Sequence, residues 1–545
     1  MKRLTILLTA VVLSLHLMAE NYLELAKQAG KEGNYEAMVE YATQHLSTSP
    51  KDATAYFYRA VAYASIKEYG KALKDLSQAI AYYNKKCADL TLTDLYGIRA
   101  LIYEEIEEYE KALADYNTAV KKDKNNAEAY TNRAEYYYRM DEYALAEQDY
   151  RKAAMLQPDN SVWQIEMARC RLAQAHYEEA GAILKPLTKL EPRNEEARRL
   201  LSLVYLYQDQ KQDFVDHYLL YLDMADGGDL TLLTMVAEDG AYSYIIKAIA
   251  RMIATTENKT YWYGVRARIY RENKHYEEAL EDLQKMEQAY GDSIENPFVY
   301  YQMARCYDGL YDFPKAVDYY TRLIRFLKQN NSEEAAYYID RADAYCNSGE
   351  IDKALADTET ALELAVSGSS IIYYFRGWIY EMARNYDAAF EAYNKAITMD
   401  DGVNNIMYLL RGKNYLLHQQ DTARANADFE TVLRMDTLLE EGSCRHYALA
   451  YLGRHEEAKH WMNQLLEAYP DAGNYYDAAC LYSRMGEGEQ AVAYLRKAFE
   501  LGYRSLVHIA QDNDLDAIRE RDDFKELLLQ YQKEKVKSLL EQLTN

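Results

Sequence analysis

The 545-residue chain is poor in the residues that break helices, with only 7 Pro and 22 Gly. Collagen-like and linker-rich chains are therefore excluded, and sheet-rich folds with many Gly/Pro turns are disfavoured. Basic residues are also scarce, because 63 Lys and Arg stand against 87 Asp and Glu and give a net charge of −24. Phosphate contacts need a basic face, so this balance argues against nucleic-acid and anionic-membrane partners.

The first 19 residues have the pattern of a secretory signal peptide. Lys2 and Arg3 precede the apolar run 4–18, and Ala19 offers a small residue before the polar Glu20. The run is short for a membrane span, although an N-terminal anchor helix is the alternative. No other stretch of the sequence is long and apolar enough to cross a bilayer. We therefore expect an exported chain, periplasmic or at the cell surface, without membrane insertion of the mature part.

Six cysteines in an exported chain raise the possibility of disulfides. They are far apart, form no CxxC pair, and four of them fall within predicted helices. Buried free thiols are therefore the favoured interpretation. The alternative is a bond between Cys306 and Cys346, which would lie on neighbouring units.

A period of 34 residues dominates the sequence. In the stretch 127–160, small residues and tyrosines alternate at helical spacing, and a proline follows. Self-similarity at a period of this size is the signature of a stacked solenoid. The matching positions are Ala134, Tyr137, Tyr143, Ala146, Tyr150, Ala153 and Pro158, then 34 residues earlier Ala100, Tyr103, Tyr109, Ala112, Tyr116 and Ala119, and 34 later Ala168, Tyr177, Ala180, Leu184, Leu187 and Pro192.

Each unit is predicted to be a pair of short helices. Spacings of three and four place Ala146, Tyr150 and Ala153 on one stripe of the second helix. The residues 140–142 make the turn between the helices, and Pro158 stops the second one. Because so short a pair cannot bury its own apolar face, stability must come from stacking many pairs.

These residues resemble the tetratricopeptide repeat, and the chain is similar to the exported bacterial type. The resemblance implies an all-α solenoid of about 11–13 helix-turn-helix units that form a right-handed superhelix. Units are expected to begin near Glu20, Ala53, Thr93, Ala127, Ser161, Glu195, Thr260, Pro297, Ala335, Ser370, Asn405, Leu439 and Ala472.

The turn-like run 226–229 (Asp-Gly-Gly-Asp) interrupts the repeats. We expect a signal peptide at 1–19, an N-terminal array at 20–225, a degenerate connector of two helices at 226–259, a C-terminal array at 260–501 and a capping segment at 502–545. The segment after Gly502 resembles a motif that ends such arrays in bacteria, and a last helix near 523–543 would cap the open end. Its inward residues would be Phe524, Leu527, Leu528 and Leu529.

Comparison of equivalent positions in the repeat units predicts a salt bridge within the unit. An Arg just before the small residue of the first helix is followed by an Asp sixteen positions later, on the second helix. We predict an Arg–Asp bond within each such unit, in preference to a row of arginines for anionic ligands. The pairs are Arg59/Asp75, Arg99/Asp115, Arg133/Asp149, Arg266/Asp282, Arg341/Asp357 and, with one residue inserted, Arg411/Asp428; Arg376 and Arg445 are exceptions.

Motifs for catalysis, metals and cofactors are weak. His455 and His460 have the wrong spacing for a zinc helix. The run 512–516 begins like a calcium loop, but Ala517 replaces the turn-making glycine, and a capped turn is the better interpretation. We therefore expect no enzyme activity, no cofactor and no metal, with an enzyme of an unrecognised kind as the least favoured hypothesis.

The concave surface of the array is the predicted place for function. Exposed aromatic residues beside arginines suit protein or peptide recognition. We expect a non-catalytic scaffold that supports a complex in the bacterial cell envelope. The alternative is a structural or self-associating envelope spacer. The candidate binding residues are Tyr138, Arg169, Arg268, Arg271, Tyr301, Arg305, Tyr374 and Trp378.

Overall fold

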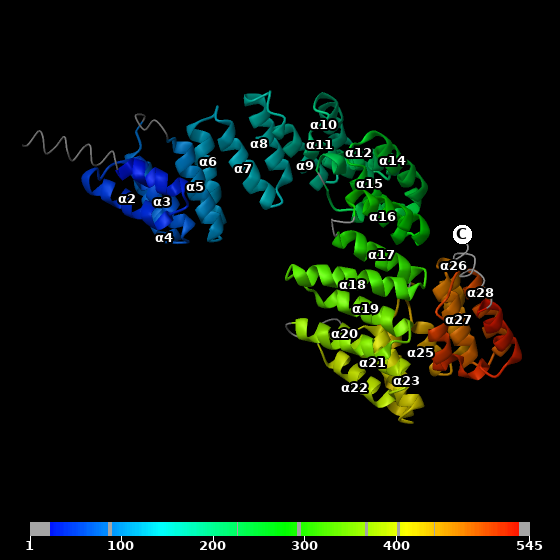
Figure 1. Cartoon of the computed structure of the whole chain (residues 1–545). Helices are drawn as coiled ribbons and strands as arrows, with labels where there is room; N and C mark the ends of the chain where they lie inside the picture. The colour runs from blue at the N-terminus through cyan, green and yellow to red at the C-terminus, as the bar shows by residue number, and fades with distance from the viewer. Residues whose placement is uncertain are drawn as a thin grey trace, which may run out of the picture. The chain divides into compact units, whose positions relative to one another are not determined.

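The computed structural model describes residues 22–84, 90–225, 227–291, 296–365, 369–399, 404–440 and 442–532. Every regular element assigned within these ranges is a helix, so the predicted all-α fold is confirmed (Figure 1). The chain divides after Asp229 into two compact units, which are described separately. The predicted signal peptide and most of the predicted last helix lie outside the described residues.

The first unit is a series of helical pairs in which each helix packs against the next along the chain. The pairs are 22–31 with α2 (Tyr35–Thr48), α3 (Ala53–Ser65) with α4 (Tyr69–Tyr82), α5 (Leu92–Glu105) with α6 (Tyr109–Lys122), α7 (Ala127–Arg139) with α8 (Tyr143–Leu156), α9 (Val162–Ala173) with α10 (Tyr177–Leu190), and α11 (Glu195–Tyr207) with α12 (Lys211–Met224).

The second unit opens with α13 (Thr231–Val236), the π-helical turn η1 (Ala237–Ala241) and α14 (Tyr242–Thr255). Three elements therefore stand where two helices were predicted, because the chain kinks at Gly240, whose φ is 89°. The pairs that follow are α15 (Lys259–Glu272) with α16 (Tyr276–Tyr290), α17 (Pro297–Gly309) with α18 (Phe313–Gln329), α19 (Ala335–Asn347) with α20 (Ile351–Leu364), α21 (Ser370–Met382) with α22 (Tyr386–Thr398), α23 (Asn405–Leu417) with α24 (Thr422–Met435), α25 (Arg445–Tyr451) with α26 (His455–Ala468), and α27 (Ala472–Arg484) with α28 (Gly488–Glu500).

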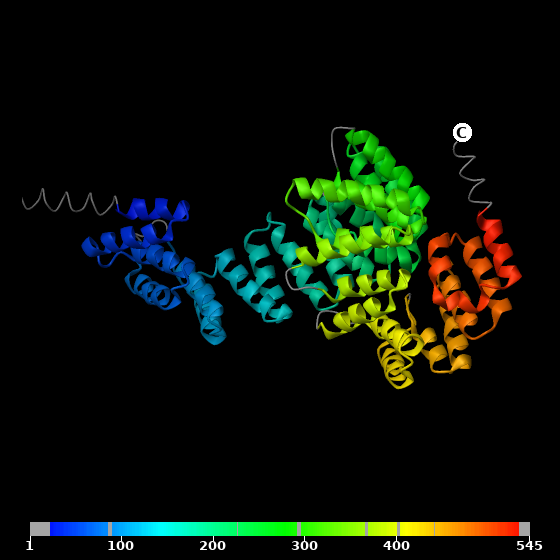
Figure 2. The ribbon, with the colours of Figure 1, turned by 60° about the horizontal axis from the view of Figure 1, so that its bottom comes forward.

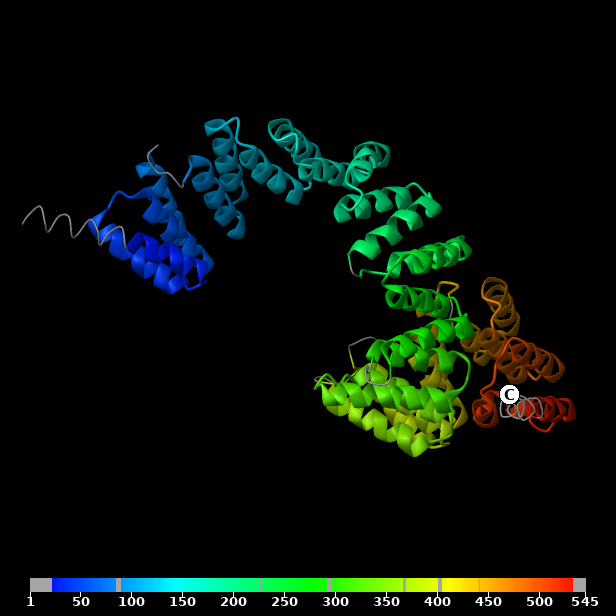
Figure 3. The same cartoon turned by 45° about the horizontal axis from the view of Figure 1, so that its top comes forward.

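The end of the second unit does not simply continue the stack. In Figures 2 and 3, the orange and red helices α26–α28 lie beside the green and yellow ones. After α28 come α29 (Leu506–Gln511), the 3₁₀ turn η2 (Asn513–Ile518) and a helix that starts at residue 522. Phe524 and Leu527 are buried as expected, whereas Leu529 is 51% exposed, so its predicted inward position is wrong.

Small residues and tyrosines build the core as the repeat predicts. Ala146 and Ala153 are fully buried, and Tyr150 between them is 3% exposed. The turn between the helices relies on a left-handed residue, such as Asp141 with a φ of 60° and Ala175 with 58°. A left-handed residue closes the C-terminus of the first helix and reverses the chain within a few residues.

All six predicted Arg–Asp bonds are present, each with two contacts of 2.6 to 2.9 Å from Nε and Nη2. Arg376 instead donates to Glu359, and Arg445 to the backbone oxygens of Leu433 and Asp436. The aspartates are buried, from 1% exposed at Asp282 to 7% at Asp115. Each bond therefore ties the two helices of its unit together.

Sequence comparison missed a second bond of the same arginines. Nη1 of Arg133 donates to Asn117 of the preceding unit at 2.7 Å, and Nη1 of Arg99 donates to Ser77 at 3.2 Å. Both acceptors lie two residues after the aspartate of their own unit. One guanidinium group thus links its own pair of helices to the pair before it.

One predicted unit begins later than expected, at Arg445 and not near Leu439. The carboxylate of Asp436 accepts hydrogen bonds from the backbone nitrogens of Cys444 and Arg445 at 2.8 and 3.0 Å. This capped loop takes the place of the first turns of the helix.

Five cysteines are buried and free, which confirms the favoured interpretation for them: Cys170, Cys306, Cys346, Cys444 and Cys480. Cys87 lies outside the described residues.

Candidate ligand-binding surfaces

The first helices of successive pairs lie next to one another and form a surface that we call the first-helix face. Contacts of α5 with α7, α9 with α11, α19 with α21 and α23 with α25 define it. We call the position of the Arg in the Arg–Asp bonds, and its equivalent in the other units, the arginine slot. On several first helices the residues two and five positions after this slot line a pocket or carry charge. In the second unit the residues of these two slots include Arg268, Arg271, Arg305, Asp308, Asp343, Trp378, Glu381 and Lys413.

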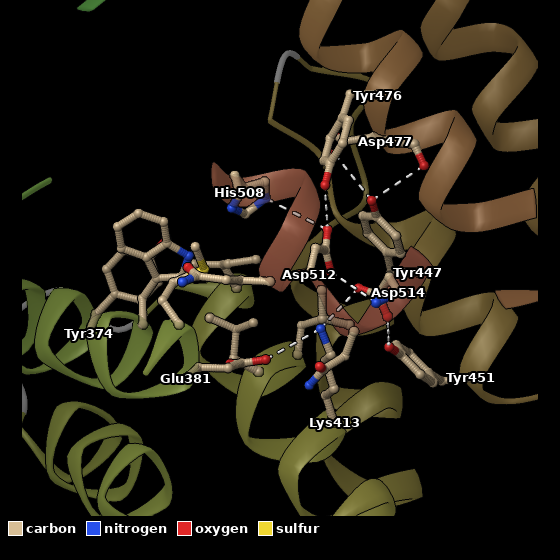
Figure 4. Close-up of a pocket in the computed structure, with 17 residues that line it drawn as sticks. Tyr374, Glu381, Lys413, Tyr447, Tyr451, Tyr476, Asp477, His508, Asp512 and Asp514 are labelled. Atoms are coloured by element: carbon tan, nitrogen blue, oxygen red, sulfur yellow. Dashed lines mark hydrogen bonds and ion pairs between the residues drawn. The ribbon is translucent and has the colours of Figure 1, made fainter. Parts of the chain in front are cut away.

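A cavity of about 210 Å³ opens on the first-helix face of the second unit. Its wall from α21 carries Tyr374 and Trp378, two of the predicted binding residues, while α23 contributes Leu409 and Lys413. Residues of α25, α27 and the segment 508–514 complete the lining. Figure 4 shows Tyr374 on one side of this pocket and the carboxylates of Asp512 and Asp514 on the other.

Lys413 is the central cation of the pocket and is only 7% exposed. Its Nζ lies 2.9 Å from Asp514 and 3.3 Å from Glu381 (Figure 4). Burial alone would lower the pKa of this lysine, but the two carboxylates hold its pKa well above the ordinary value. Tyr451 adds a hydrogen bond of 2.7 Å to Asp514.

Two further carboxylates of the pocket differ in their partners. Asp512 accepts hydrogen bonds from Tyr476 at 2.8 Å and from the backbone nitrogen of Asp514 at 2.9 Å, and it lies 3.6 Å from His508. The bond from the backbone nitrogen confirms the predicted capped turn. Asp477 accepts a hydrogen bond of 3.1 Å from Tyr447. Burial, strengthened by nearby carboxylates, raises the pKa of Asp477 to about 7.

The C-terminal segment covers much of this face. Ser505 donates to Asn347 of α19 at 3.4 Å, and Asn513 donates to Tyr386 of α22 at 3.2 Å. The ring of Tyr503 lies 5.1 Å from that of Tyr311, after α17. These contacts join residues more than 120 positions apart, so the segment fastens the end of the unit onto its earlier repeats.

A tyrosine–carboxylate pair recurs with a spacing of twelve residues. Tyr116 donates to Glu104 at 2.6 Å, and Tyr393 donates to Glu381 at 2.9 Å. In each case a cation from the next first helix completes the pair. Arg139 lies 2.9 Å from Glu104, and Lys413 lies 3.3 Å from Glu381.

The third such pair has no such cation. Tyr320 donates to Asp308 at 2.6 Å, but the slot that holds Lys413 beside Glu381 holds Asp343 here. The Oδ1 atom of Asp308 is buried and has no hydrogen-bond partner among the described residues. Burial, with Asp343 and Asp340 nearby, raises the pKa of Asp308 to about 7, and burial, with Asp340 nearby, raises the pKa of Asp343 to about 7 as well.

The predicted arginines of the second unit are engaged within the chain. Arg271 donates to Gln302 at 2.7 Å, and Arg305 lies 3.6 Å from Asp340. The Nε atom of Arg268 is buried without a partner among the described residues. Tyr301 packs against Tyr337 with ring centres 5.5 Å apart.

The first unit has its own pocket, with a volume of about 270 Å³. Tyr138 and Arg169, both predicted binding residues, line it together with Trp163 and Glu166. Arg169 lies 2.7 Å from Glu196 and 3.5 Å from Glu166. The positive charge of this arginine is therefore paired with carboxylates of the same unit. The two pockets thus contain four of the eight predicted residues, and the other four lie on α15 and α17.

The acids and Lys413 around Trp378 were missed by sequence analysis. Glu381 lies five positions after Arg376, and Lys413 lies two positions after Arg411, so a comparison of the repeats could have found both residues. Asp477 and the segment 508–514 could not be found in this way. Within the described ranges, no group of three metal-ligating side chains is placed to hold an ion, and no helix has the length and apolarity to cross a membrane.

Family models described as tetratricopeptide repeat match residues 140–204, 298–325, 339–404 and 472–501, and a TPR repeat model matches 100–141. One curated relative, a chloroplastic protein of Arabidopsis thaliana, is 30% identical over 83 residues, which are 14% of this chain. The chain spans only 25% of that relative's length.

Solved structures that match half or more of this chain share little sequence with it. A tetratricopeptide repeat protein from Parabacteroides merdae has 17% identity and a TM-score of 0.31, covering 53% of this chain and 99% of its own. The C-terminal part of a TPR repeat-containing protein from Cytophaga hutchinsonii has 16% identity and a TM-score of 0.35, with coverages of 53% and 99%. The Cut9–Hcn1 hetero-tetramer of the APC/C gives 14% identity, a TM-score of 0.32 and coverages of 92% and 96%.

Proposed function

Because this chain is a tetratricopeptide repeat protein, we propose that it is a non-catalytic scaffold that binds a protein or peptide on its first-helix faces. The observation that carries this proposal is the pair of pockets lined by a tryptophan and a tyrosine. Trp163 and Tyr138 line one of them, and Trp378 and Tyr374 line the other. Large aromatic side chains surrounded by polar groups are typical of the residues that dominate protein-binding energy.

Capture of partners by the immobilised full chain tests this function. We expect a protein from an extract of the source cells to be retained by the wild type and lost from the double variant Trp163→Ala, Trp378→Ala. Tyr207→Ala is the control, because Tyr207 is 59% exposed and lines neither pocket. Equal retention by all three proteins would contradict the proposal, and capture of further copies of the chain alone would favour the spacer hypothesis.

The proposed setting of the scaffold is a complex of the bacterial cell envelope, in the periplasm or at the cell surface. The signal-peptide pattern of residues 1–19 supports it. We expect the mature chain to begin at Glu20, which mass spectrometry of the N-terminal peptide would show. An intact N-terminus on a chain recovered from the cytoplasmic fraction would contradict this setting.

A further inference from the structure

We propose that the first-helix face of the second unit binds a basic segment of its partner, with lysine or arginine side chains seated beside Trp378 and beside Asp308. This inference rests on the proposed function and adds the chemistry of the ligand. It follows from comparison of equivalent repeat positions, from the charges of the cavity and from the shape of its walls.

The first argument is the incomplete tyrosine–carboxylate pair. Glu104 and Glu381 each receive one tyrosine hydroxyl and one cation from the next repeat. Asp308 receives only Tyr320, and a second carboxylate, Asp343, occupies the position that Lys413 has beside Glu381. Like charges at one site repel, so a cation from outside the chain would complete the arrangement.

Neighbouring charges do not supply the missing cation. Arg305 is the basic side chain that acts on both Asp308 and Asp343, and it is shared with a third carboxylate, Asp340, at 3.6 Å. The side chain of Arg305 is 42% exposed, so solvent screens part of its charge. Three carboxylates therefore share one arginine, and the buried Oδ1 of Asp308 remains an unused acceptor.

The second argument is the charge of the cavity beside Trp378. Four carboxylates line it, against Lys413 within the lining and Arg484, which lies 3.6 Å from Asp514. Its lining also has two buried atoms without partners among the described residues, Oε1 of Gln511 and Nδ1 of His508. Nε2 of His508 faces Asp512 at 3.6 Å, and Oε1 of Gln511 is therefore the clear acceptor without a partner in this lining. A ligand that donates hydrogen bonds and carries positive charge matches this surplus of acceptors.

The third argument is the wall opposite the carboxylates. Tyr374 and Trp378 from α21, with Leu409 from α23, form an apolar and aromatic side of the cavity. Figure 4 shows Tyr374 on this side. Lysine and arginine have long methylene stems that pack on such surfaces while the charged head reaches polar groups. Aromatic faces also attract the cation directly. A basic side chain therefore suits both sides of the cavity.

The two sites belong to one surface. Tyr374 of α21 lines the cavity, and α21 packs against α19, which carries Asp343. No cluster suited to a metal ion occurs in the described residues, which favours an organic cation as the occupant. A single extended segment with several basic residues could fill both sites.

Fluorescence polarisation with the full chain tests the inference. The probes are three labelled twelve-residue peptides that alternate alanine with lysine, glutamine or glutamate. We expect the lysine peptide to bind at least tenfold more tightly than the glutamine peptide, to weaken with added salt, and the glutamate peptide not to bind. Equal affinity for the lysine and glutamine peptides would overturn the inference.

Isosteric variants locate the binding. Asp308→Asn and Asp477→Asn should each weaken the lysine peptide about three- to tenfold. Asp352→Asn makes the same change of net charge on the exposed side of α20 and should leave its affinity unchanged. An equal loss in all three variants would mean attraction by overall charge alone and would also overturn the inference.

The outcome can be separated from that of the proposed function. If the lysine peptide fails to bind while the Trp163→Ala, Trp378→Ala change still abolishes capture of the cellular partner, the chemistry of the ligand is wrong and the scaffold function stands. If partner capture is also unaffected by the Trp163→Ala, Trp378→Ala change, both fail. Thermal unfolding of each variant beside the wild type identifies any loss that comes from misfolding.

Discussion

The two units use one repeat frame but present different first-helix faces. In the first unit, Glu104 is matched by Arg139, and the pocket beside Trp163 balances acids with arginines. In the second unit, Asp308 faces Asp343, carboxylates outnumber cations beside Trp378, and the segment 503–514 covers part of the face. The Arg–Asp bonds and the buried small residues recur in both units, but the residues two and five positions after the arginine slot differ from repeat to repeat. The repeat architecture therefore does not by itself determine which ligand a unit prefers.

The Arg–Asp bond is common to both units, and breaking it should have the largest effect. Asp115→Ala in the first unit or Asp282→Ala in the second leaves a partly buried arginine without its partner. We expect a loss of about 3–5 kcal/mol in each case, confined to the unit that carries the change. Urea unfolding, with hydrogen exchange as the readout for each unit, measures this loss of stability. Glu105→Ala is the control, because Glu105 is exposed. Loss in both units at once would show that they unfold together.

The bond between Lys413 and Asp514 exists only in the second unit. Asp514→Ala should destabilise that unit by about 1.5–3 kcal/mol, less than the Arg–Asp change because Glu381 still faces the lysine. Asp516→Ala is the matched control, since the side chain of Asp516 is 59% exposed. A denaturation midpoint equal to that of the control would show that the segment contributes nothing through this contact.

Glu104 and Asp308 occupy equivalent positions, and replacing each by its neutral amide should change the free energy of unfolding in opposite directions. Glu104→Gln removes the partner of Arg139 and should cost about 1 kcal/mol. Asp308 has a folded-state pKa of about 7, above its ordinary value near 4, so its contribution to stability is present at low pH and lost as the pH rises through 7.

We therefore expect Asp308→Asn to stabilise the chain by about 1 kcal/mol at pH 8 and by less at pH 5. The groups that face this carboxyl are Tyr320, Arg305, Asp340 and Asp343. Thermal melts of both variants at the two pH values measure the effect. Destabilisation by Asp308→Asn at pH 8 would contradict the assigned excess of carboxylates around Asp308.

The inter-helix turns should give the smallest effects. Ala175 of the first unit holds a φ of 58° at the turn position where Gly486 of the second unit holds 79°. Glycine adopts this conformation without strain. Ala175→Gly should therefore stabilise its unit by up to about 1 kcal/mol, and Gly486→Ala should destabilise the other by a similar amount. The same direction of change in both variants would refute this account of the turns.

Local periodicity made much of the fold predictable. The Arg–Asp bonds were foreseen because both partners lie sixteen or seventeen residues apart within one unit, and the stripe of Ala146, Tyr150 and Ala153 because its spacing is helical. The later start at Arg445 was not foreseen, since a single carboxylate, that of Asp436, organises the loop before it.

The binding surface was only partly predictable. Aromatic residues such as Trp378 stood out by type, but the acids and Lys413 beside it did not. Contacts such as Lys413 with Asp514 join positions 101 residues apart, and no repeat period relates them. The arginines Arg271 and Arg305 were expected to face a ligand, yet in the structure they already contact Gln302 and Asp340.

Hydrogen exchange of residues 503–518 tests most directly whether the second unit carries its own C-terminal segment on its first-helix face. In the wild-type full chain we expect the backbone amides of this segment to exchange slowly, and to exchange faster, together with those of α23, in Asp514→Ala. Fast exchange of the segment in the wild type, or no change in α23 in the variant, would contradict the account.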